Sequence, residues 1–192
     1  HVADLVDSDF GVVNLNYPLC PEVTITEIVE TLHVGLRHIV DYLQSKNFDQ
    51  KIVLIGHSAG AHLSMHLSHS KALRGRLSGI IAISGVYELG FIKEISVQDD
   101  VHLSDNEVNS LDCLKFPPLQ GLKYYISAGG KEPSAWIDQS WIMTEFLLKR
   151  GDDVKFHVCA DAHHFNLVDR LCDGNHLDGM ILKDWLNKEF DG

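Results

Sequence analysis

The stretch KIVLIGHSAGAHLSMHLSH, residues 51–69, decides the fold. Its first five residues form an apolar run typical of a buried strand, and its last nine suit a helix. Between them lies GHSAG, residues 56–60, a G-x-S-x-G pattern. A sharp turn from a strand into a helix needs glycines where the backbones crowd, and it lifts its serine above the sheet. The pattern therefore predicts that Ser58 is a nucleophile; the alternative is a plain turn with small residues for packing.

Short β-branched runs alternate with helical periods along the whole chain, which is typical of βαβ units around a parallel sheet. Thr24 and Glu27 have capping-box spacing, and the apolar residues that follow repeat every three or four positions. Pro133 suits a helix start. The expected strands are 10–17, 51–55, 78–84, 122–130 and 153–160, and the expected helices are 25–43, 133–147 and 177–190. The fold class is therefore α/β, a mostly parallel sheet with helices on both faces.

One domain over residues 1–192 is the expected organisation, because a chain of this length can bury a single sizeable core. Residues 91–120 are irregular and acidic and carry no strand signal. A long irregular segment inside a compact domain often has a function of its own. We therefore expect residues 91–120 to be an insertion, or cap, over the site.

Composition excludes several classes of protein. The net charge is −11, whereas a protein that follows nucleic-acid phosphates needs basic stripes. Apolar runs are too short to span a bilayer, so no membrane partner is expected. The four cysteines have no C-x-x-C pair, which favours reduced thiols in a cytoplasmic protein. Since the sequence starts at His1, a targeting signal ahead of it stays open.

A serine nucleophile needs a base, and the base needs an acid that holds its tautomer. Strand-to-helix nucleophiles of this type use the chain order serine, acid, histidine. After the last expected strand the chain offers His163 and His164 as bases. After the preceding strand it offers Glu132 and Asp138 as acids. Glu132 falls in the loop while Asp138 falls inside the helix, so geometry favours Glu132.

Three further histidines, His62, His66 and His69, are spaced to share one helix face and could bind a metal. No carboxylate or fourth ligand accompanies them with motif spacing. We therefore expect partly exposed helix histidines and no metal. His57 precedes the nucleophile, where its backbone geometry matters more than its ring.

Five segments together resemble the kynurenine formamidase (arylformamidase) family, α/β-hydrolases related to the hormone-sensitive-lipase-like esterases. They are NYPLCPEVTITEIV (16–29), GHSAGAHL (56–63), SGVYEL (84–89), WIDQS (136–140) and HHFNLVDRL (163–171). The resemblance implies the α/β-hydrolase fold and hydrolysis of N-formyl-L-kynurenine to L-kynurenine and formate, in tryptophan breakdown. It also implies a small aromatic N-formyl substrate and no metal or organic cofactor.

By position, the resemblance makes Ser58 the nucleophile, His164 the base and Glu132 the acid. The backbone N–H of Ala59 becomes one oxyanion donor. Family members commonly have aspartate at the acid position, so the longer Glu132 side chain has to retract by one methylene to reach the imidazole.

The family's H-G-G loop, which supplies the other oxyanion donor, has no counterpart in this sequence. Neither has the strand expected between residues 10–17 and 51–55 of the sheet. The resemblance thus describes an N-terminally truncated α/β-hydrolase, and we expect residues 1–192 alone to be nearly inactive and poorly folded. Two rival functions remain: a general carboxylesterase with a larger acyl pocket, and a non-catalytic remnant. A homodimer stays open as the assembly state.

Overall fold

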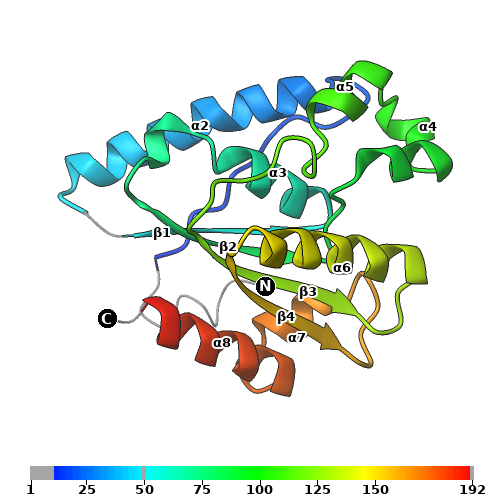
Figure 1. Ribbon diagram of the computed structural model, residues 1–192. Coiled ribbons are helices and arrows are strands. Elements are labelled where there is room, and N and C mark those ends of the chain that lie inside the picture. The colour runs from blue at the N-terminus through cyan, green and yellow to red at the C-terminus, as the bar shows by residue number, and fades with distance from the viewer. Residues whose placement is uncertain (1–10, 49–50, 191–192) are drawn as a thin grey trace.

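The computed structural model describes residues 11–48 and 51–190. A four-stranded parallel sheet lies at its centre, and its spatial order β1-β2-β3-β4 is also the order of the chain (Figure 1). The strands are β1 (Ile52–His57), β2 (Leu77–Ile83), β3 (Lys123–Gly129) and β4 (Asp153–Cys159). Because the strands are parallel, their carboxyl ends share one edge of the sheet, where ligand sites of open α/β sheets lie.

Burial increases from the outer strands to the inner ones. Ile80 and Ile81 of β2 and Tyr124 and Tyr125 of β3 are fully buried, because helices cover both faces of these two strands. Ile55 of β1 remains 44% exposed. The inner strands read as continuous apolar runs, as expected for a sheet covered on both faces.

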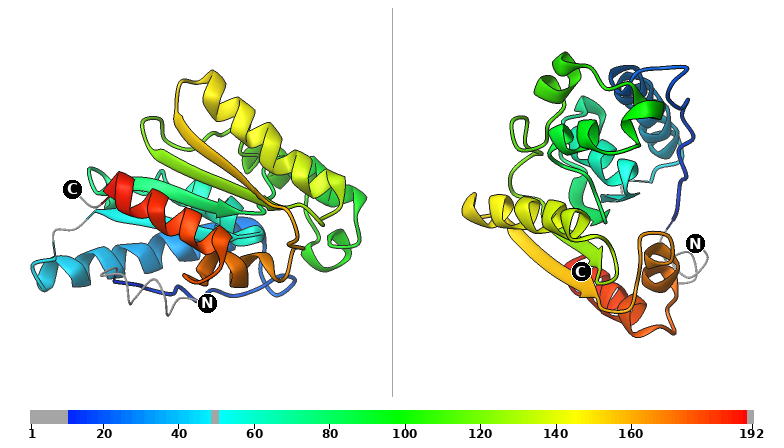
Figure 2. Two further views of the ribbon diagram at one scale, coloured as in Figure 1. Left: turned by 90° about the horizontal axis from the view of Figure 1, so that it is seen from below. Right: turned by 90° about the vertical axis from the view of Figure 1, so that its right-hand side faces the viewer.

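Helices form layers on the two faces of the sheet (Figure 2). Alternate strand residues face opposite sides, so Ile80 and Tyr124 contact one helical layer and Ile81 and Tyr125 the other. The first layer is α3 (Ala59–Leu67) and α6 (Ser134–Lys149), and the second is α7 (Leu167–Cys172) and α8 (Leu177–Phe190). This arrangement confirms the predicted helices on both faces.

Helix α2 (Ile25–Ser45) lies outside α3 and packs its apolar stripe against Leu63 and Leu67. Its capping box forms as predicted: the Glu27 N–H donates to the Thr24 hydroxyl, and the Thr24 N–H donates to the Glu27 carboxylate. A short 3-10 helix, η1 (Lys71–Leu73), joins α3 to β2 and contacts the same apolar cluster through Leu73.

The expected strand at residues 10–17 is wrong for residues 11–17, and residue 10 lies outside the described residues. A strand needs a hydrogen-bonded neighbour. In the described part of the chain, β1 pairs only with β2, and no ladder includes residues 11–17. Instead, Leu15 and Tyr17 pack against the α2 cluster, which explains the alternating pattern without a sheet.

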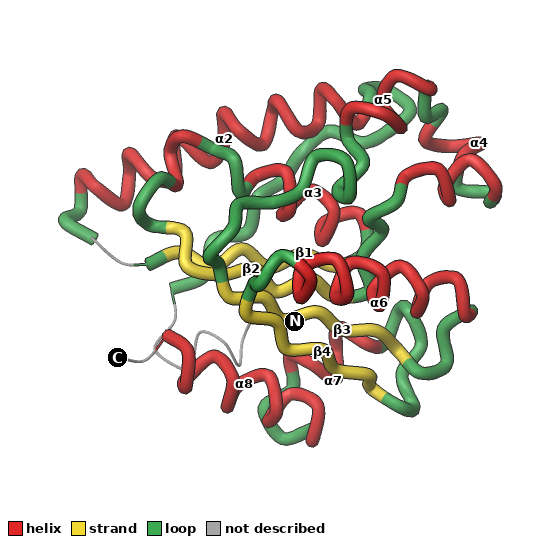
Figure 3. The backbone as a smooth tube through the Cα atoms, viewed as in Figure 1, coloured by secondary structure: helices red, strands yellow, loops and turns green. Residues whose placement is uncertain are grey.

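Residues 91–120 contain no strand, as predicted, but they are not wholly irregular (Figure 3). They include most of a 3-10 helix, η2 (Leu89–Glu94), and two short helices, α4 (Gln98–Val101) and α5 (Asp105–Ser110). Their apolar side chains, including Leu103 and Leu111, form a separate cluster that reaches Ile25 of α2 and Trp136 of α6.

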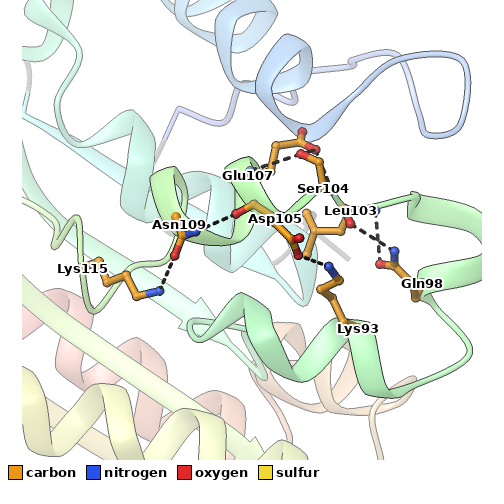
Figure 4. Close-up of polar contacts among 8 residues, drawn as sticks. All are labelled: Lys93, Gln98, Leu103, Ser104, Asp105, Glu107, Asn109 and Lys115. Atoms are coloured by element: carbon orange, nitrogen blue, oxygen red, sulfur yellow. Dashed lines mark hydrogen bonds and ion pairs between the residues drawn. The ribbon is translucent and has the colours of Figure 1, made fainter.

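Glu107 fixes this segment to the rest of the chain. One carboxylate oxygen accepts the N–H and hydroxyl of Ser104, which completes the capping box of α5 (Figure 4). The other oxygen accepts the N–H and hydroxyl of Thr26, in the first turn of α2, each at 3.2 Å. Lys93 and Asp105 add an exposed ion pair. One buried carboxylate therefore joins the first turns of two helices, through residues that are 81 positions apart.

Candidate active site

Ser58 lies at the sharp turn between β1 and α3, where the sequence predicts the nucleophile. Its backbone has φ 56° and ψ −119°, a region that residues other than glycine rarely adopt. The Ser58 N–H donates to the Ile83 carbonyl at the end of β2, at 2.9 Å. This bond fixes the turn to the neighbouring strand. Strain of this kind is common at functional sites.

Gly56 makes the turn sterically feasible. A Cβ atom at position 56 would lie 2.0 Å from the Gly60 carbonyl oxygen, far inside van der Waals contact. The backbones before and after the serine thus touch directly, and a side chain at residue 56 would force them apart. The first glycine of GHSAG is explained by this close approach.

Glu132 and His164 meet at the carboxyl edge of the sheet. Glu132 follows β3 and His164 follows β4, and the His164 Nδ1 atom lies 2.7 Å from Glu132 Oε1. The side chain of Glu132 folds back, so that its Oε2 atom accepts the Gly129 N–H at 2.6 Å. This is the retraction expected of a residue one methylene longer than aspartate.

The two alternative candidates point elsewhere. Asp138 is exposed on α6, and His163 is exposed with its Nδ1 atom accepting the Phe165 N–H. The structure thus brings together Glu132 and His164, and it does not bring in Asp138 or His163.

Ser84 is a site residue that the sequence analysis missed. It follows β2, is fully buried, and has a positive φ of 45°. Its hydroxyl donates to Glu132 Oε1 and lies 3.0 Å from His164 Nδ1. The sequence feature that could have identified Ser84 is its place at the carboxyl end of a central strand, inside the SGVYEL segment.

The predicted nucleophile, Ser58, adjoins in the chain a histidine that contacts the predicted base, His164. The ring of His57, next to Ser58, lies 4.6 Å from the His164 ring, centroid to centroid. Within residues 11–48 and 51–190, no hydrogen bond joins the Ser58 hydroxyl to His164. Catalytic hydrogen bonds are often long without substrate and tighten when it binds. The exposed Ala59 begins α3, where a backbone N–H has no partner in its own helix.

Aromatic side chains surround the base. The Trp136 ring lies 4.8 Å from the His164 ring, and Phe91 packs edge-on against Trp136 at 5.5 Å. Phe165 is 83% exposed and lies 5.5 Å from His164. An exposed aromatic ring beside a buried acid–histidine pair is an unusual placement for a residue with only a packing role.

The surroundings of the site favour the ionised form of Glu132 and the neutral form of His57. Burial raises the pKa of Glu132, but hydrogen bonds from His164, Ser84 and the Gly129 N–H outweigh burial and hold that pKa below its usual value. Burial, with the charge of His164, lowers the pKa of His57. The site therefore holds a carboxylate anion beside the base at neutral pH.

The expectation of partly exposed histidines on α3 is wrong for two of the three. His62 and His66 are 3% and 4% exposed, and each donates to a backbone carbonyl, of Val86 and Leu111 respectively. They lie beside the Cys113 thiol, which the sequence spacing could not reveal. His69 is half-buried and bonds the Pro117 carbonyl instead.

The chain is similar to known proteins over most of its length. The family model BD-FAE matches residues 1–93. Kynurenine formamidase of Drosophila melanogaster is 25% identical over 181 residues, covering 88% of this chain and 60% of the relative. Kynurenine formamidase of Danio rerio is 24% identical, covering 96% of this chain and 65% of the relative. The chain thus spans a little under two thirds of the length of these relatives.

Solved structures show the fold. A fungal esterase from Rhizomucor miehei superposes with a TM-score of 0.71 at 19% identity, and esterase LipW from Mycobacterium marinum with 0.70 at 18%. Both alignments cover 92% of this chain. They cover 62% of the Rhizomucor miehei chain and 61% of the Mycobacterium marinum chain. The chain has the α/β-hydrolase fold. In this chain the turn at Ser58 and the loops that carry Glu132 and His164 all lie at the carboxyl ends of the strands of one sheet, as the corresponding turn and loops do in α/β-hydrolases.

No helix within the described residues is long and apolar enough to cross a membrane.

Proposed function

We propose that this chain carries the catalytic site of a serine hydrolase that cleaves N-formyl-L-kynurenine to L-kynurenine and formate. The observation that carries the proposal is the partly buried hydrogen bond between Glu132 and His164, close to a strained serine turn. The substrate comes from the curated relatives, which are named kynurenine formamidase and align with most of this chain. Ser58, Glu132 and His164 are the proposed triad.

The Glu132 carboxylate fixes the tautomer of the base. An anion at Glu132 Oε1 holds the proton of His164 on Nδ1, which leaves Nε2 with a lone pair. His164 Nε2 then takes the proton of the Ser58 hydroxyl as the serine oxygen attacks the formyl carbon. The negative charge that develops on the formyl oxygen is stabilised by the Ala59 N–H, at the start of α3.

His164 next returns the proton to the departing nitrogen, and L-kynurenine leaves as an aryl amine. A water molecule, deprotonated by the same histidine, attacks the formyl-serine ester, releases formate and restores Ser58. Every proton in this cycle passes through His164. No metal or organic cofactor is needed for any step.

An aromatic leaving group suits the surroundings of the base. Trp136 and Phe165 flank His164, and Phe91 extends this surface into the segment 91–120. We propose that this segment acts as the cap over the leaving-group side of the site, within a single domain of residues 1–192. A formyl group is small, so the acyl side needs little room.

A general carboxylesterase is the second candidate, because the solved structures with this fold include several esterases. Hydrolysis of a formyl anilide and of a butyryl ester by the same preparation separates the two. A clear preference for the formyl anilide supports the formamidase, and equal or faster turnover of the butyryl ester favours the esterase.

A non-catalytic remnant is distinguished by labelling. Only a serine whose proton is removed by a base reacts readily with a phosphonate probe. Stoichiometric labelling of the native chain, absent in Ser58→Ala, supports an active site, and no labelling supports a remnant.

The proposed setting is the cytoplasm. None of the four cysteines, all within the described residues, forms a disulfide, which suits a reducing compartment. The proposed partner is a small aromatic N-formyl compound, and a homodimer remains open.

A further inference from the structure

A second group of reactive side chains lies on the sheet face opposite α3 and α6. His157 and Cys159 are two residues apart on β4, so both point to the face that α8 covers. Asp178, in the first turn of α8, reaches them from above, and its Oδ1 atom lies 2.8 Å from His157 Nε2. One ligand atom from each of His157, Cys159 and Asp178 lies within 4.8 Å of the other two.

We propose that His157, Cys159 and Asp178 bind a divalent transition-metal ion, Zn²⁺ by the chemistry of the donors. Imidazole nitrogen, thiolate sulfur and carboxylate oxygen are the three ligand types that zinc uses in proteins. With zinc–ligand bonds of about 2.0–2.3 Å, tetrahedral ligands stand about 3.3–3.8 Å apart. The three ligand atoms, which lie within 4.8 Å of one another, would adjust to this spacing on binding, and water would be the fourth ligand.

The surroundings supply groups that suit such a site. His176 Nδ1 accepts the Asp178 N–H at 3.2 Å, which fixes the backbone at the start of α8 beside the proposed ligands. The Tyr125 side chain is fully buried, and its hydroxyl has no hydrogen-bond partner among the described residues.

Tyr125 also lies close to the proposed ligands. Its ring lies 6.2 Å from the His157 ring, centroid to centroid. A phenolic O–H there can donate to a metal-bound water or to a ligating oxygen.

The other histidine–cysteine group in the described residues is a natural comparison. His62, His66 and Cys113 are also close together, but the two ring nitrogens nearest the sulfur already donate to carbonyls of Val86 and Leu111. No carboxylate belongs to that group. A metal there would break two hydrogen bonds to main-chain carbonyls, whereas His157 Nε2 would release a proton that it shares with Asp178, which itself becomes a ligand, so we assign the metal to His157, Cys159 and Asp178 alone.

Metal binding at this site would stabilise the two loops that carry Glu132 and His164. The Cys159 carbonyl accepts the N–H of Gly130, in the loop that carries Glu132, and the N–H of Ala162, in the loop that carries His164. A metal bound to Cys159 and to α8 would fix the point where both loops meet. This inference is independent of the serine chemistry, and Ser58→Ala should bind metal like the native chain.

The test uses Co²⁺, whose spectrum reports its ligands, on the full chain freed of metal by a chelator. We expect one equivalent to bind, with the visible bands of tetrahedral cobalt and a thiolate-to-cobalt charge-transfer band. Cys159→Ser should remove the charge-transfer band, and Cys113→Ser should keep it. Asp178→Asn should weaken binding about 10- to 100-fold, and addition of Zn²⁺ should displace the cobalt and raise the melting temperature of the native chain.

Two results would overturn the proposal: no saturable binding of one equivalent, or a charge-transfer band that survives Cys159→Ser and disappears in Cys113→Ser. Circular dichroism checks that each variant is folded. If Cys159→Ser does not fold, His157→Gln replaces it, and unchanged cobalt affinity in that variant counts against the site.

Discussion

The Nδ1 atom of His164 lies 2.7 Å from Oε1 of Glu132, and the Ser84 hydroxyl donates to the same carboxylate oxygen. The three residues follow three successive strands, β2, β3 and β4. One oxygen of one carboxylate therefore connects the carboxyl ends of three neighbouring strands. The arrangement both stabilises the buried negative charge of Glu132 and fixes the direction of the imidazole.

Ser58→Ala should abolish hydrolysis while leaving the fold intact. Members of a catalytic triad work as a unit, so the expected loss in kcat is on the order of 10⁴-fold or more. Alanine keeps the same backbone at residue 58 and removes only the hydroxyl. Steady-state kinetics on a protein that includes the upstream oxyanion loop measures the loss, and retention of most activity would remove Ser58 from the mechanism.

Glu132→Gln should lower kcat by about 10³-fold or more, because the amide no longer holds His164 in the tautomer that leaves Nε2 free. Asp138→Asn is the matched control, since Asp138 is exposed and should change kcat by less than about twofold. Circular dichroism checks folding. A larger loss from Asp138→Asn than from Glu132→Gln would show that the acid is assigned to the wrong residue.

Ser84→Ala should lower kcat/KM by roughly tenfold, about the value of one hydrogen bond to a charged group. Removing a donor to the ionised form also raises the pKa of Glu132, so the acidic limb of the pH–rate profile should move to higher pH. Ser127→Ala is the control, because the buried Ser127 hydroxyl has no hydrogen-bond partner in the described part of the chain. An unmoved acidic limb in Ser84→Ala contradicts the role given to Ser84.

His62 should make the chain sensitive to mild acid. Burial, with the charge of His66, lowers the pKa of His62 from 6.5 to about 3. Between these two values the unfolded chain binds a proton that the folded chain excludes, so the free energy of unfolding falls as the pH decreases through that window. The contribution is on the order of a few kcal/mol.

His62→Asn keeps a donor for the Val86 carbonyl and removes the titrating group, so it should flatten the pH dependence. His38→Asn, at an exposed position on α2, should not. Urea unfolding at several pH values between 4 and 7 measures both slopes. Equal slopes in native chain and His62→Asn would show that another group controls acid stability.

Glu107→Ala should destabilise the chain by about 2 kcal/mol, because it removes hydrogen bonds at two helix starts at about 1 kcal/mol each. Its exposed neighbour in the same segment, Glu94, serves as the control and should change little on replacement by alanine. Urea unfolding gives the difference. A Glu107→Ala variant as stable as Glu94→Ala would mean that the contacts to Ser104 and Thr26 contribute nothing measurable.

Local patterns predicted a large part of this structure. The GHSAG turn, the Thr24–Glu27 capping box and the helix after Pro133 depend on nearby residues, so the sequence shows them directly. Glu132 could be chosen over Asp138 because a loop after a strand reaches the sheet edge and a helix interior does not. In each case the deciding contact spans few residues.

Long-range contacts explain what the sequence analysis missed. Residues 11–17 alternate like a strand, but whether they pair depends on a neighbour that local pattern cannot supply. His62 and His66 are buried by the Leu111–Cys113 region, nearly 50 positions away. Ser84 joins the site only because the Glu132 side chain folds back toward it. These outcomes depend on packing between distant segments.

The sheet's spatial order has a consequence for synthesis. Since β1 to β4 are neighbours in the order in which they are made, each new strand leaving the ribosome can dock on the one before it, without waiting for a later segment to insert. Ser58 would then reach its strained turn before the loop that carries His164 is made, because His164 follows β4. The Glu132–His164 pair would therefore assemble beside a serine turn that is already in place.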